Sequence, residues 1–245
     1  MSSALFGAAV VTGASGGIGR ATAVALASPG MSVCVTGRDV GRLQDTANQI
    51  AARRAQRILV HPADLSTDEG IHDLVARVRT ELQRVDVLVH AAGTMCLGSI
   101  ESAGWNDLDD QYRVNLRAPF LLTKAFLPML KEARGQVVFV NSTAGLSATA
   151  DNGLYAATKH ALGSIAGSIR NHLNPYGIRV VSIFPGRTAT TMQEAAHRFE
   201  GKSYTPSELM QADDVAQVIL STLVLARSAE VTDITVRPMK KPSAT

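Results

Sequence analysis

Short runs of apolar, often β-branched residues alternate along the chain with longer segments whose apolar positions recur at helical spacing. The short runs predict seven strands, at residues 8–12, 32–36, 57–61, 85–90, 136–141, 179–184 and 232–237. The longer segments predict helices near residues 18–28, 40–54, 68–83, 105–132, 154–174 and 212–226. Near-continuous apolar strands are typical of sheets that are covered on both faces. The pattern therefore predicts an α/β fold with a doubly wound, parallel, seven-stranded sheet and helices on both faces.

Two stretches depart from this regular pattern. Residues 187–211 are polar and weakly periodic, and a segment of that length inside a compact fold is usually a lid or disordered. Residues 240–245 are expected to form a frayed tail. Because no Pro/Ser-rich linker and no repeat interrupts the strand–helix alternation, we expect a single domain over residues 1–245.

Composition excludes several classes of protein. The chain carries 24 basic and 21 acidic residues, a balance too even to indicate nucleic-acid binding. Its two cysteines form neither a disulfide framework nor a metal site, and Cys34 is expected to be a buried small apolar residue. No apolar run approaches the roughly 18 residues needed to cross a bilayer, and no signal peptide is visible. We therefore expect no metal, no nucleic acid, no membrane association and a cytoplasmic location.

A glycine-rich turn follows the first predicted strand directly and opens a helix. It reads Gly-Ala-Ser-Gly-Gly-Ile-Gly over residues 13–19. Glycines let the backbone turn tightly and let a pyrophosphate approach the amides at the helix N-terminus. The turn therefore predicts a dinucleotide site that includes Gly13, Ser15, Gly17, Ile18 and Gly19. The alternative is a glycine-rich turn without a ligand.

The ends of the second and third strands are expected to bind the adenosine. The second strand is followed by Gly37-Arg38-Asp39, which offers a guanidinium in place of the carboxylate that binds the ribose 2′-hydroxyl of NAD. Arg38 therefore favours NADP(H) over NAD(H), and Asp39 could cap the next helix. Asp64 and Leu65, after the third strand, could meet the adenine, although a cap or turn role for Asp64 is as plausible.

Three further side chains form a candidate catalytic set. Ser142 follows the fifth predicted strand, at the carboxyl edge where open α/β sheets bind ligands. Tyr155 opens the next helix thirteen positions later, and Lys159 lies one turn further on the same helix face. An ammonium beside a phenol stabilises the phenolate, and a serine hydroxyl can donate to a carbonyl oxygen that gains negative charge. The set predicts proton transfer during carbonyl reduction.

With these motifs in this order, the chain resembles the short-chain dehydrogenase/reductase family, in its branch of roughly 250 residues with one Rossmann-type domain. The resemblance runs nearly end to end and includes residues 12–19, Asn115, Ser142, Tyr-Ala-Ala-Thr-Lys at 155–159, and Pro185-Gly186. It implies Tyr155 as general acid/base, Lys159 as the cation that lowers its pKa and holds the nicotinamide ribose, and Ser142 as carbonyl positioner. It further implies a proton-relay role for Asn115, through a bound water. It also implies cofactor contacts from the region after the sixth strand, namely Pro185, Gly186, Thr188 and Thr190.

The chain departs from the family pattern at three places. The usual Asn-Asn-Ala-Gly after the fourth strand is His90-Ala91-Ala92-Gly93, which keeps the cofactor-facing backbone of Ala92 and Gly93 but loses two amide side chains. His90 is expected to be a structural histidine with its polar atoms paired. Gly16 stands where many NADP-using members carry a basic residue, which leaves Arg38 as the main phosphate ligand. Arg237-Pro238-Met239 replaces a C-terminal Gly-Gly turn.

Substrate contacts are expected from residues 94–101, 143–153 and 187–205, after a cofactor half at about residues 1–115 and within a catalytic part at about 116–239. These segments offer a mostly apolar set, namely Met95, Leu97, Leu146, Met192 and Phe199, and Arg187 is the lone candidate cation. We expect an NADP(H)-dependent interconversion of a small to medium, largely apolar ketone and a secondary alcohol. The alternatives are a 3-oxoacyl-carrier-protein reductase or a catalytically idle dinucleotide-binding protein. The resemblance also implies a homodimer or homotetramer.

Overall fold

The computed structural model describes residues 7–239, so the tail predicted at 240–245 lies outside the described residues. Seven parallel strands form one sheet in the order β3-β2-β1-β4-β5-β6-β7. The order reverses beside β1, where β4 pairs with its other edge, and this creates the crevice in which doubly wound folds bind ligands. The strands are β1 (Gly7–Thr12), β2 (Met31–Gly37), β3 (Arg57–Pro62), β4 (Val87–His90), β5 (Gln136–Val140), β6 (Arg179–Pro185) and β7 (Asp233–Val236).

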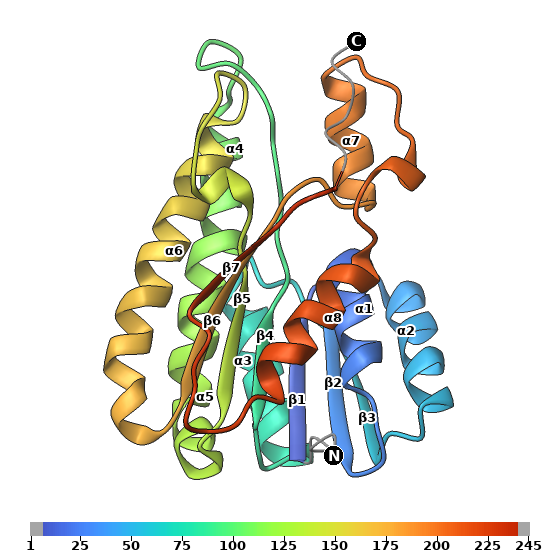
Figure 1. Ribbon diagram of the computed structural model, residues 1–245, viewed down its shortest axis with the longest axis vertical. Helices are drawn as coiled ribbons and strands as arrows, with labels where there is room; N and C mark the ends of the chain where they lie inside the picture. Colours follow the sequence, from blue (N-terminus) through green and yellow to red (C-terminus); the bar gives the residue numbers. More distant parts are fainter. Residues whose placement is uncertain (1–6, 240–245) are drawn as a thin grey trace.

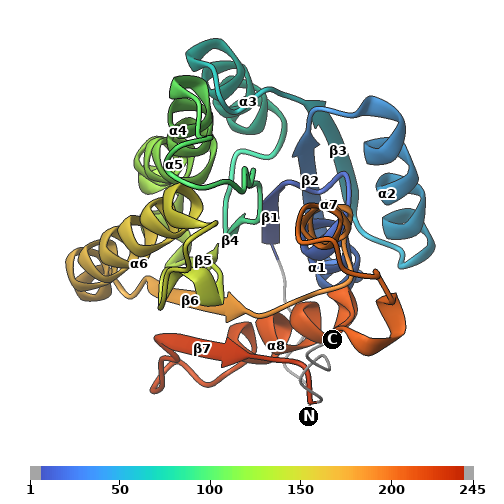
Figure 2. The same ribbon diagram turned by 90° about the horizontal axis from the view of Figure 1, so that it is seen from above.

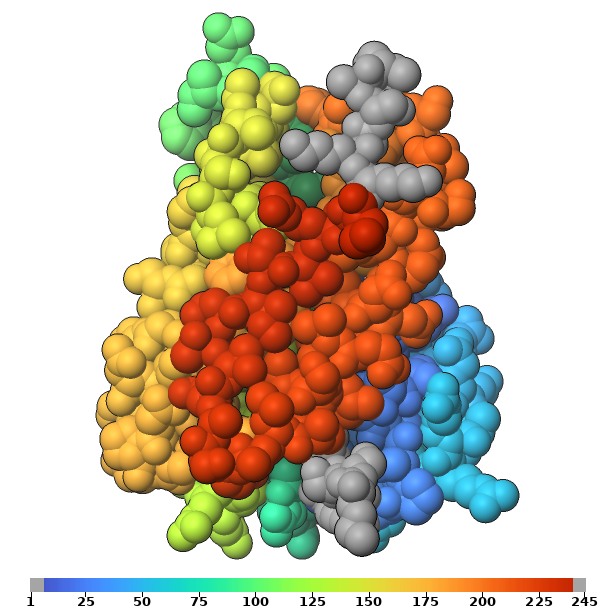
Figure 3. All heavy atoms as spheres, viewed as in Figure 1, coloured from blue at the N-terminus to red at the C-terminus, as the bar shows by residue number. Residues whose placement is uncertain are grey.

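Helices cover both faces of the sheet, as the sequence predicts (Figures 1 and 2). The chain begins its helices with α1 (Gly17–Leu26), α2 (Val40–Ala52), α3 (Asp68–Glu81), α4 (Trp105–Tyr112) and α5 (Ala118–Ala133). It continues with α6 (Gly153–Leu173), α7 (Thr191–Phe199) and α8 (Ala212–Leu223). Short helical turns are η1 (Arg113–Arg117), η2 (Thr143–Gly145), η3 (Asn174–Tyr176) and η4 (Pro206–Glu208). Figure 3 shows α8 and β7 over the middle of one face, between α6 and α2.

Two apolar cores fill the space between the sheet and the helices, one on each face of the sheet. Val10, Leu88 and Phe139 point toward α3, α5 and α6, whereas the alternate positions Val11 and Val89 point toward α1 and α8. The strands are therefore apolar on both faces, which explains their near-continuous runs in the sequence. Cys34 lies fully buried in the first core, as predicted, and burial raises the pKa of its thiol to about 12.

Two predicted elements differ in detail. The helix predicted near residues 105–132 is interrupted by the π-helical turn η1, which holds Asn115. The segment at 187–211 contains the ordered helix α7, where the sequence predicted only a lid or a disordered segment. Within residues 7–239, no helix is long and apolar enough to span a bilayer.

Candidate active site

A cavity of about 1040 Å³ opens at the carboxyl edge of the sheet. This volume lies just above the usual range for ligand pockets, about 300–1,000 Å³. Every residue that the sequence predicts to bind the cofactor lines this cavity. These are Gly13, Ser15, Gly17, Ile18, Gly19, Arg38, Asp64, Leu65, Ala92, Gly93, Tyr155, Lys159, Pro185, Gly186, Thr188 and Thr190.

The glycine turn leaves a helix N-terminus open toward the cavity. Helix α1 begins without a side-chain cap and without an acidic residue in its first turn, so its first amides keep their donor capacity. Gly13 adopts φ +67°, and a Cβ atom there would lie 2.6 Å from the Ala92 nitrogen. A Cβ atom at Gly19 would lie 2.3 Å from the Gly13 carbonyl oxygen. The turn thus requires glycine for close packing, and the free amides beside it fit a pyrophosphate.

Thr12 holds the backbone that follows β4. Its Oγ1 accepts hydrogen bonds from the Ala91 and Ala92 amides at 3.0 and 3.1 Å and donates to the Val89 carbonyl at 3.3 Å. The hydroxyl therefore keeps this cofactor-facing backbone in place where residues 91 and 92 have no polar side chains. A threonine at the end of a buried strand indicates only packing by itself, so this role of Thr12 emerges from the tertiary structure alone.

The adenosine end of the cavity carries two arginines. Arg38 lines it as predicted, and Arg42, which the sequence analysis did not single out, lines it from the first turn of α2. Asp39 caps α2 by accepting from the Arg42 amide at 3.0 Å. The Asp64 Oδ1 atom accepts from the Ser66 amide and hydroxyl at 2.9 and 2.8 Å, which is a turn role. These bonds hold the pKa of the Asp64 carboxyl below its usual range, and its adenine contact stays a prediction.

Ser142 is positioned by the end of β5 and by η2. Its Oγ accepts a hydrogen bond from the Ala144 amide at 3.1 Å, which leaves the hydroxyl proton free for another acceptor. Asn141, the preceding residue, accepts from the Ser142 amide at 2.9 Å and donates to the Lys159 carbonyl at 3.1 Å. Asn141 therefore links the serine to the helix that carries the lysine, a link that only the tertiary structure reveals.

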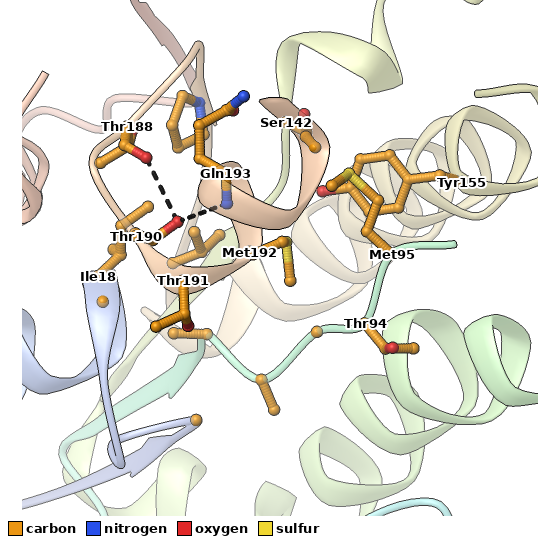
Figure 4. Close-up of a pocket in the computed structure, with 18 of the residues that line it drawn as sticks. Ile18, Thr94, Met95, Ser142, Tyr155, Thr188, Thr190, Thr191, Met192 and Gln193 are labelled. Atoms are coloured by element: carbon orange, nitrogen blue, oxygen red, sulfur yellow. Dashed lines mark hydrogen bonds between the residues drawn. The ribbon is translucent and has the colours of Figure 1, made fainter. Parts of the chain in front are cut away.

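Tyr155 lies in the first turn of α6 with its side chain buried. Burial raises the pKa of its phenol above the ordinary value, and the hydrogen bond with Ser142 opposes that shift in part. The phenol is therefore a protonated donor at neutral pH in the cofactor-free protein. Figure 4 shows Tyr155 and Ser142 on the same side of the cavity.

Lys159 lies one turn further along α6, buried to 4% exposure. Its Nζ donates to the Val140 carbonyl at 3.0 Å and lies 5.8 Å from the centroid of the Tyr155 ring. Burial lowers the pKa of the ammonium to about 8. The Tyr155 phenol and the Lys159 ammonium therefore lie close together, as expected, and burial shifts the pKa of both groups toward their uncharged forms.

Asn115 lies behind the cavity on η1, with 1% exposure. Its side chain accepts from the Thr94 amide at 2.8 Å and donates to the Thr94 carbonyl at 2.8 Å and the Thr158 hydroxyl at 3.1 Å. Both ends of the amide therefore have partners. Both amide protons are in use, whereas the Oδ1 atom keeps a second lone pair, and the proton-relay role of Asn115 stays a prediction.

His90 is structural but incompletely paired. Thr123 Oγ1 donates to the Pro119 carbonyl at 2.8 Å, so the His90 Nε2, 2.9 Å from that hydroxyl, is the donor in their bond. The ring stacks on Phe139, and the buried Nδ1 has no hydrogen-bond partner. Desolvation lowers the pKa of His90 to about 3, so the ring stays neutral. The prediction of a structural role thus agrees with its burial, whereas full pairing was wrong.

The segment after β6 folds over the glycine turn as a lid. Thr190 caps α7 by accepting from the Gln193 amide at 3.2 Å and donates to the Thr188 carbonyl at 3.3 Å (Figure 4). A Cβ atom at Gly17, where φ is +50°, would lie 3.0 Å from the Thr190 methyl group. The start of the lid therefore packs directly on the turn that opens α1.

The substrate side of the cavity is mixed in character. Met95, Leu97, Met192 and Phe199 line it as predicted, and Figure 4 shows Met192 between the start of the lid and Ser142. Leu146, the C-cap residue of η2, does not line the cavity and is 55% exposed, so its predicted substrate contact was wrong.

The predicted lone cation of this region is already paired. Arg187 contacts both carboxylate oxygens of Glu200, at 2.6 and 2.8 Å. Lys202, a second cation of the cavity wall, lies 3.0 Å from the same carboxylate. Arg187 is therefore not free to bind an acidic substrate. Among residues 7–239, no cluster of His, Cys, Asp or Glu could hold a metal ion.

Comparisons with known proteins agree with this geometry. The family model described as short chain dehydrogenase matches residues 7–201. An uncharacterised oxidoreductase from Staphylococcus aureus is 31% identical over 232 residues, which cover 94% of this chain and 96% of that protein. An alcohol dehydrogenase from Thermococcus sibiricus, solved with 5-hydroxy-NADP, has a TM-score of 0.87 and 26% identity, with 98% and 100% of the two chains covered. A metagenomic short-chain oxidoreductase, solved with NADP, has a TM-score of 0.83 and 31% identity over the same shares.

Proposed function

We propose that this chain, which belongs to the short-chain dehydrogenase family, interconverts a ketone and a secondary alcohol with NADP(H) as its cofactor. The observation that carries the proposal is the convergence of Ser142, Tyr155 and Lys159 on the cavity that the glycine turn also lines. A protein that only bound a dinucleotide would not need a buried phenol and a buried ammonium beside each other. Burial of these two groups lowers the stability of the folded protein, and a catalytic role would account for keeping them in the cavity.

The cofactor is NADP(H), and two features of the chain agree with the solved relatives that hold it. The open amides of α1 fit a pyrophosphate, and Arg38 lies on the cavity wall where β2 ends. When bound, NADPH supplies the hydride. Gly13, Ser15 and Gly19 would hold its phosphates, and Pro185 and Thr190 its nicotinamide end.

In the reducing direction, the chain's own groups handle the proton. The Ser142 hydroxyl, whose oxygen already accepts from the Ala144 amide, donates to the carbonyl oxygen and positions it. Tyr155, protonated at neutral pH, gives its phenolic proton to that oxygen as negative charge develops there. Lys159 stabilises the phenolate that remains until it is reprotonated.

The substrate is a small to medium, largely apolar ketone or alcohol. Met95, Met192 and Phe199 supply apolar surface on its side of the cavity, and the charge of Arg187 is held by Glu200. We further infer that residues up to about 115 serve the cofactor and the remainder serves catalysis and the substrate, within one domain. A cytoplasmic location and a homodimer or homotetramer stay predictions of the sequence.

The test is NADPH oxidation with a panel of neutral ketones, for the natural protein and for Tyr155→Phe. We expect turnover that the substitution abolishes, with NADPH affinity kept. Turnover that survives Tyr155→Phe would remove the tyrosine from its role. Tight NADPH binding without turnover across ketones and alcohols would instead favour a catalytically idle binding protein.

The cofactor preference has its own measurement. Binding titrations of NADPH and NADH with Arg38→Ala should show a selective loss of NADPH affinity, because the guanidinium forms charge-assisted hydrogen bonds to the 2′-phosphate, which NADH lacks. Equal affinities of the natural protein for the two cofactors would contradict a phosphate-binding role for Arg38.

A further inference from the structure

We propose that Arg42 is a second ligand of the adenosine 2′-phosphate and that it occupies the place of a basic side chain at position 16. The inference rests on the proposed use of NADP(H) and adds to it a specificity-determining residue. A phosphate dianion binds two guanidinium groups more tightly than one, since each can form charge-assisted hydrogen bonds to different oxygens.

The position of the Arg42 side chain carries the proposal. A Cβ atom built on Gly16 would lie 2.9 Å from an Arg42 Nη atom, so the guanidinium lies directly over this glycine. Gly16 has φ −179°, an extended conformation that any residue adopts. The backbone therefore does not require glycine here. The missing side chain instead gives the Arg42 guanidinium its space at the wall of the cavity that Ser15 and Gly37 also line.

Side-chain hydrogen bonds hold the backbone of Arg42 against the glycine turn. The Thr46 hydroxyl, one turn further along α2, donates to the Ala14 carbonyl at 2.8 Å. The Arg20 side chain donates to the Ser15 carbonyl at 2.9 Å and to the Arg42 carbonyl at 3.3 Å. These bonds connect the first turn of α2 to the turn that would hold the pyrophosphate. The Cα atom of Arg42 is therefore fixed relative to the cofactor site before any ligand binds.

The charges around Arg42 leave it available for an anion. Within residues 7–239, neither Arg38 nor Arg42 forms a salt bridge, whereas Arg57, Arg84 and Arg117 each pair with a carboxylate. The nearby carboxylates have other partners: Asp39 accepts from the Arg42 main-chain amide, and Asp64 accepts from Ser66. The charge of Asp64 acts on Arg38 from a distance. Two unpaired cations thus face one end of the cavity.

The test compares three variants by titration with NADPH and NADH. Arg42→Gln removes the proposed ligand. Arg53→Gln is the matched control, because it removes an exposed cation from the other end of α2. The double variant Gly16→Arg/Arg42→Gln moves the cation to position 16, where only the flexible Arg42 side chain stands in the way of a new one. Thermal unfolding of each variant checks that it folds.

We expect Arg42→Gln to weaken NADPH binding about tenfold and to leave NADH binding unchanged, since one charge-assisted contact to the phosphate is lost. Arg53→Gln should change neither affinity, and the double variant should regain most of the NADPH affinity. The loss caused by Arg42→Gln should shrink as salt rises. The fragments 2′,5′-ADP and 5′-AMP should reproduce the difference between the two cofactors.

Two results would overturn the inference while leaving the proposed function intact. One is an Arg42→Gln protein that binds NADPH as tightly as the natural protein. The other is a variant that loses NADPH and NADH equally, which would indicate a structural role for the side chain. If the natural protein itself does not prefer NADPH over NADH, both the cofactor assignment and this inference fail.

Discussion

The Lys159 Nζ atom donates a hydrogen bond to the Val140 carbonyl over 3.0 Å, which anchors the ammonium of α6 to the last residue of β5. Asn141 forms the reciprocal connection, from the end of β5 to the Lys159 main chain at 3.1 Å. Two buried hydrogen bonds therefore join the end of β5 to α6, directly before Ser142. The Lys159 ammonium loses its hydration when it is buried beside Tyr155. This desolvation lowers its pKa, so the stability of the protein depends on pH.

Lys159 should give the protein a measurable dependence of stability on alkaline pH. Its folded pKa of about 8 lies below the ordinary value of 10.5, so between these values the unfolded chain binds a proton that the folded protein does not. The free energy of unfolding should therefore rise with pH across this window, by at most about 1.4 kcal/mol per pH unit. Lys159→Met should lack this rise, as measured by urea unfolding from pH 7.5 to 10.5. Lys124→Met, at an exposed lysine, is the control and should keep it.

His90 should make the protein sensitive to acid. Its folded pKa of about 3 lies below the ordinary value of 6.5, so below pH 6.5 the unfolded chain gains a proton that the buried ring cannot accept. Stability is therefore fully present above about pH 6.5 and is lost as the pH falls toward 3. His90→Leu should flatten this part of the unfolding curve, because Thr123 keeps its bond to the Pro119 carbonyl. His72→Leu, at an exposed histidine, should not, and equal slopes in both variants would contradict the assignment.

Ser142→Ala should separate catalysis from cofactor binding. The hydroxyl proton of Ser142 is free to be donated to the substrate, so its loss should lower kcat/KM roughly 100-fold to 1,000-fold, the range measured for single oxyanion donors. NADPH affinity should stay within about twofold in a binding titration, because the proposed cofactor contacts come from other residues. A parallel loss of NADPH affinity would show that the substitution disturbs the end of β5 instead.

Glu200→Gln should change which ketones the enzyme accepts. The carboxylate holds Arg187 through contacts at 2.6 and 2.8 Å, and removing its charge leaves the guanidinium available to an anionic substrate. The kcat/KM for a keto acid, relative to its methyl ester, should then rise roughly tenfold, as expected for one new charge-assisted contact. Glu194→Gln, on an exposed turn of α7, is the matched control. An unchanged ratio in Glu200→Gln would place Arg187 outside the substrate's reach.

Much of the fold could be predicted from local patterns. All seven strands were found, with ends that differ by at most two residues, because strands buried on both faces appear as continuous apolar runs. Helix α7 was missed although Met192, Ala196 and Phe199 recur at helical spacing, because the helix is short and most of the residues around it are polar. The π turn η1 was missed because its residues continue the helical pattern on either side.

The site was predictable where a motif has a fixed spacing along the chain. The glycine turn and the Tyr155–Lys159 pair depend on neighbours in sequence, and the structure places them on one cavity. The proposed role of Arg42 could not be predicted, because it depends on the guanidinium lying over Gly16 after α2 has packed on the glycine turn. The pairing of Arg187 was equally hidden, since Glu200 reaches it only through the fold of the lid.

The sequence by itself therefore determined the strands and most of the helices, the dinucleotide turn and the predicted catalytic set. Backbone periodicity and motif spacing are local properties of the chain. The tertiary structure decided which charged side chains form salt bridges and which titratable groups have a shifted pKa. Among residues 7–239, it pairs Arg187 with Glu200 and gives neither Arg38 nor Arg42 a salt bridge, and it buries Lys159 and His90 so that the pKa of each falls. Electrostatic energies depend on burial and on distances between segments far apart in the chain, and no local pattern records those quantities.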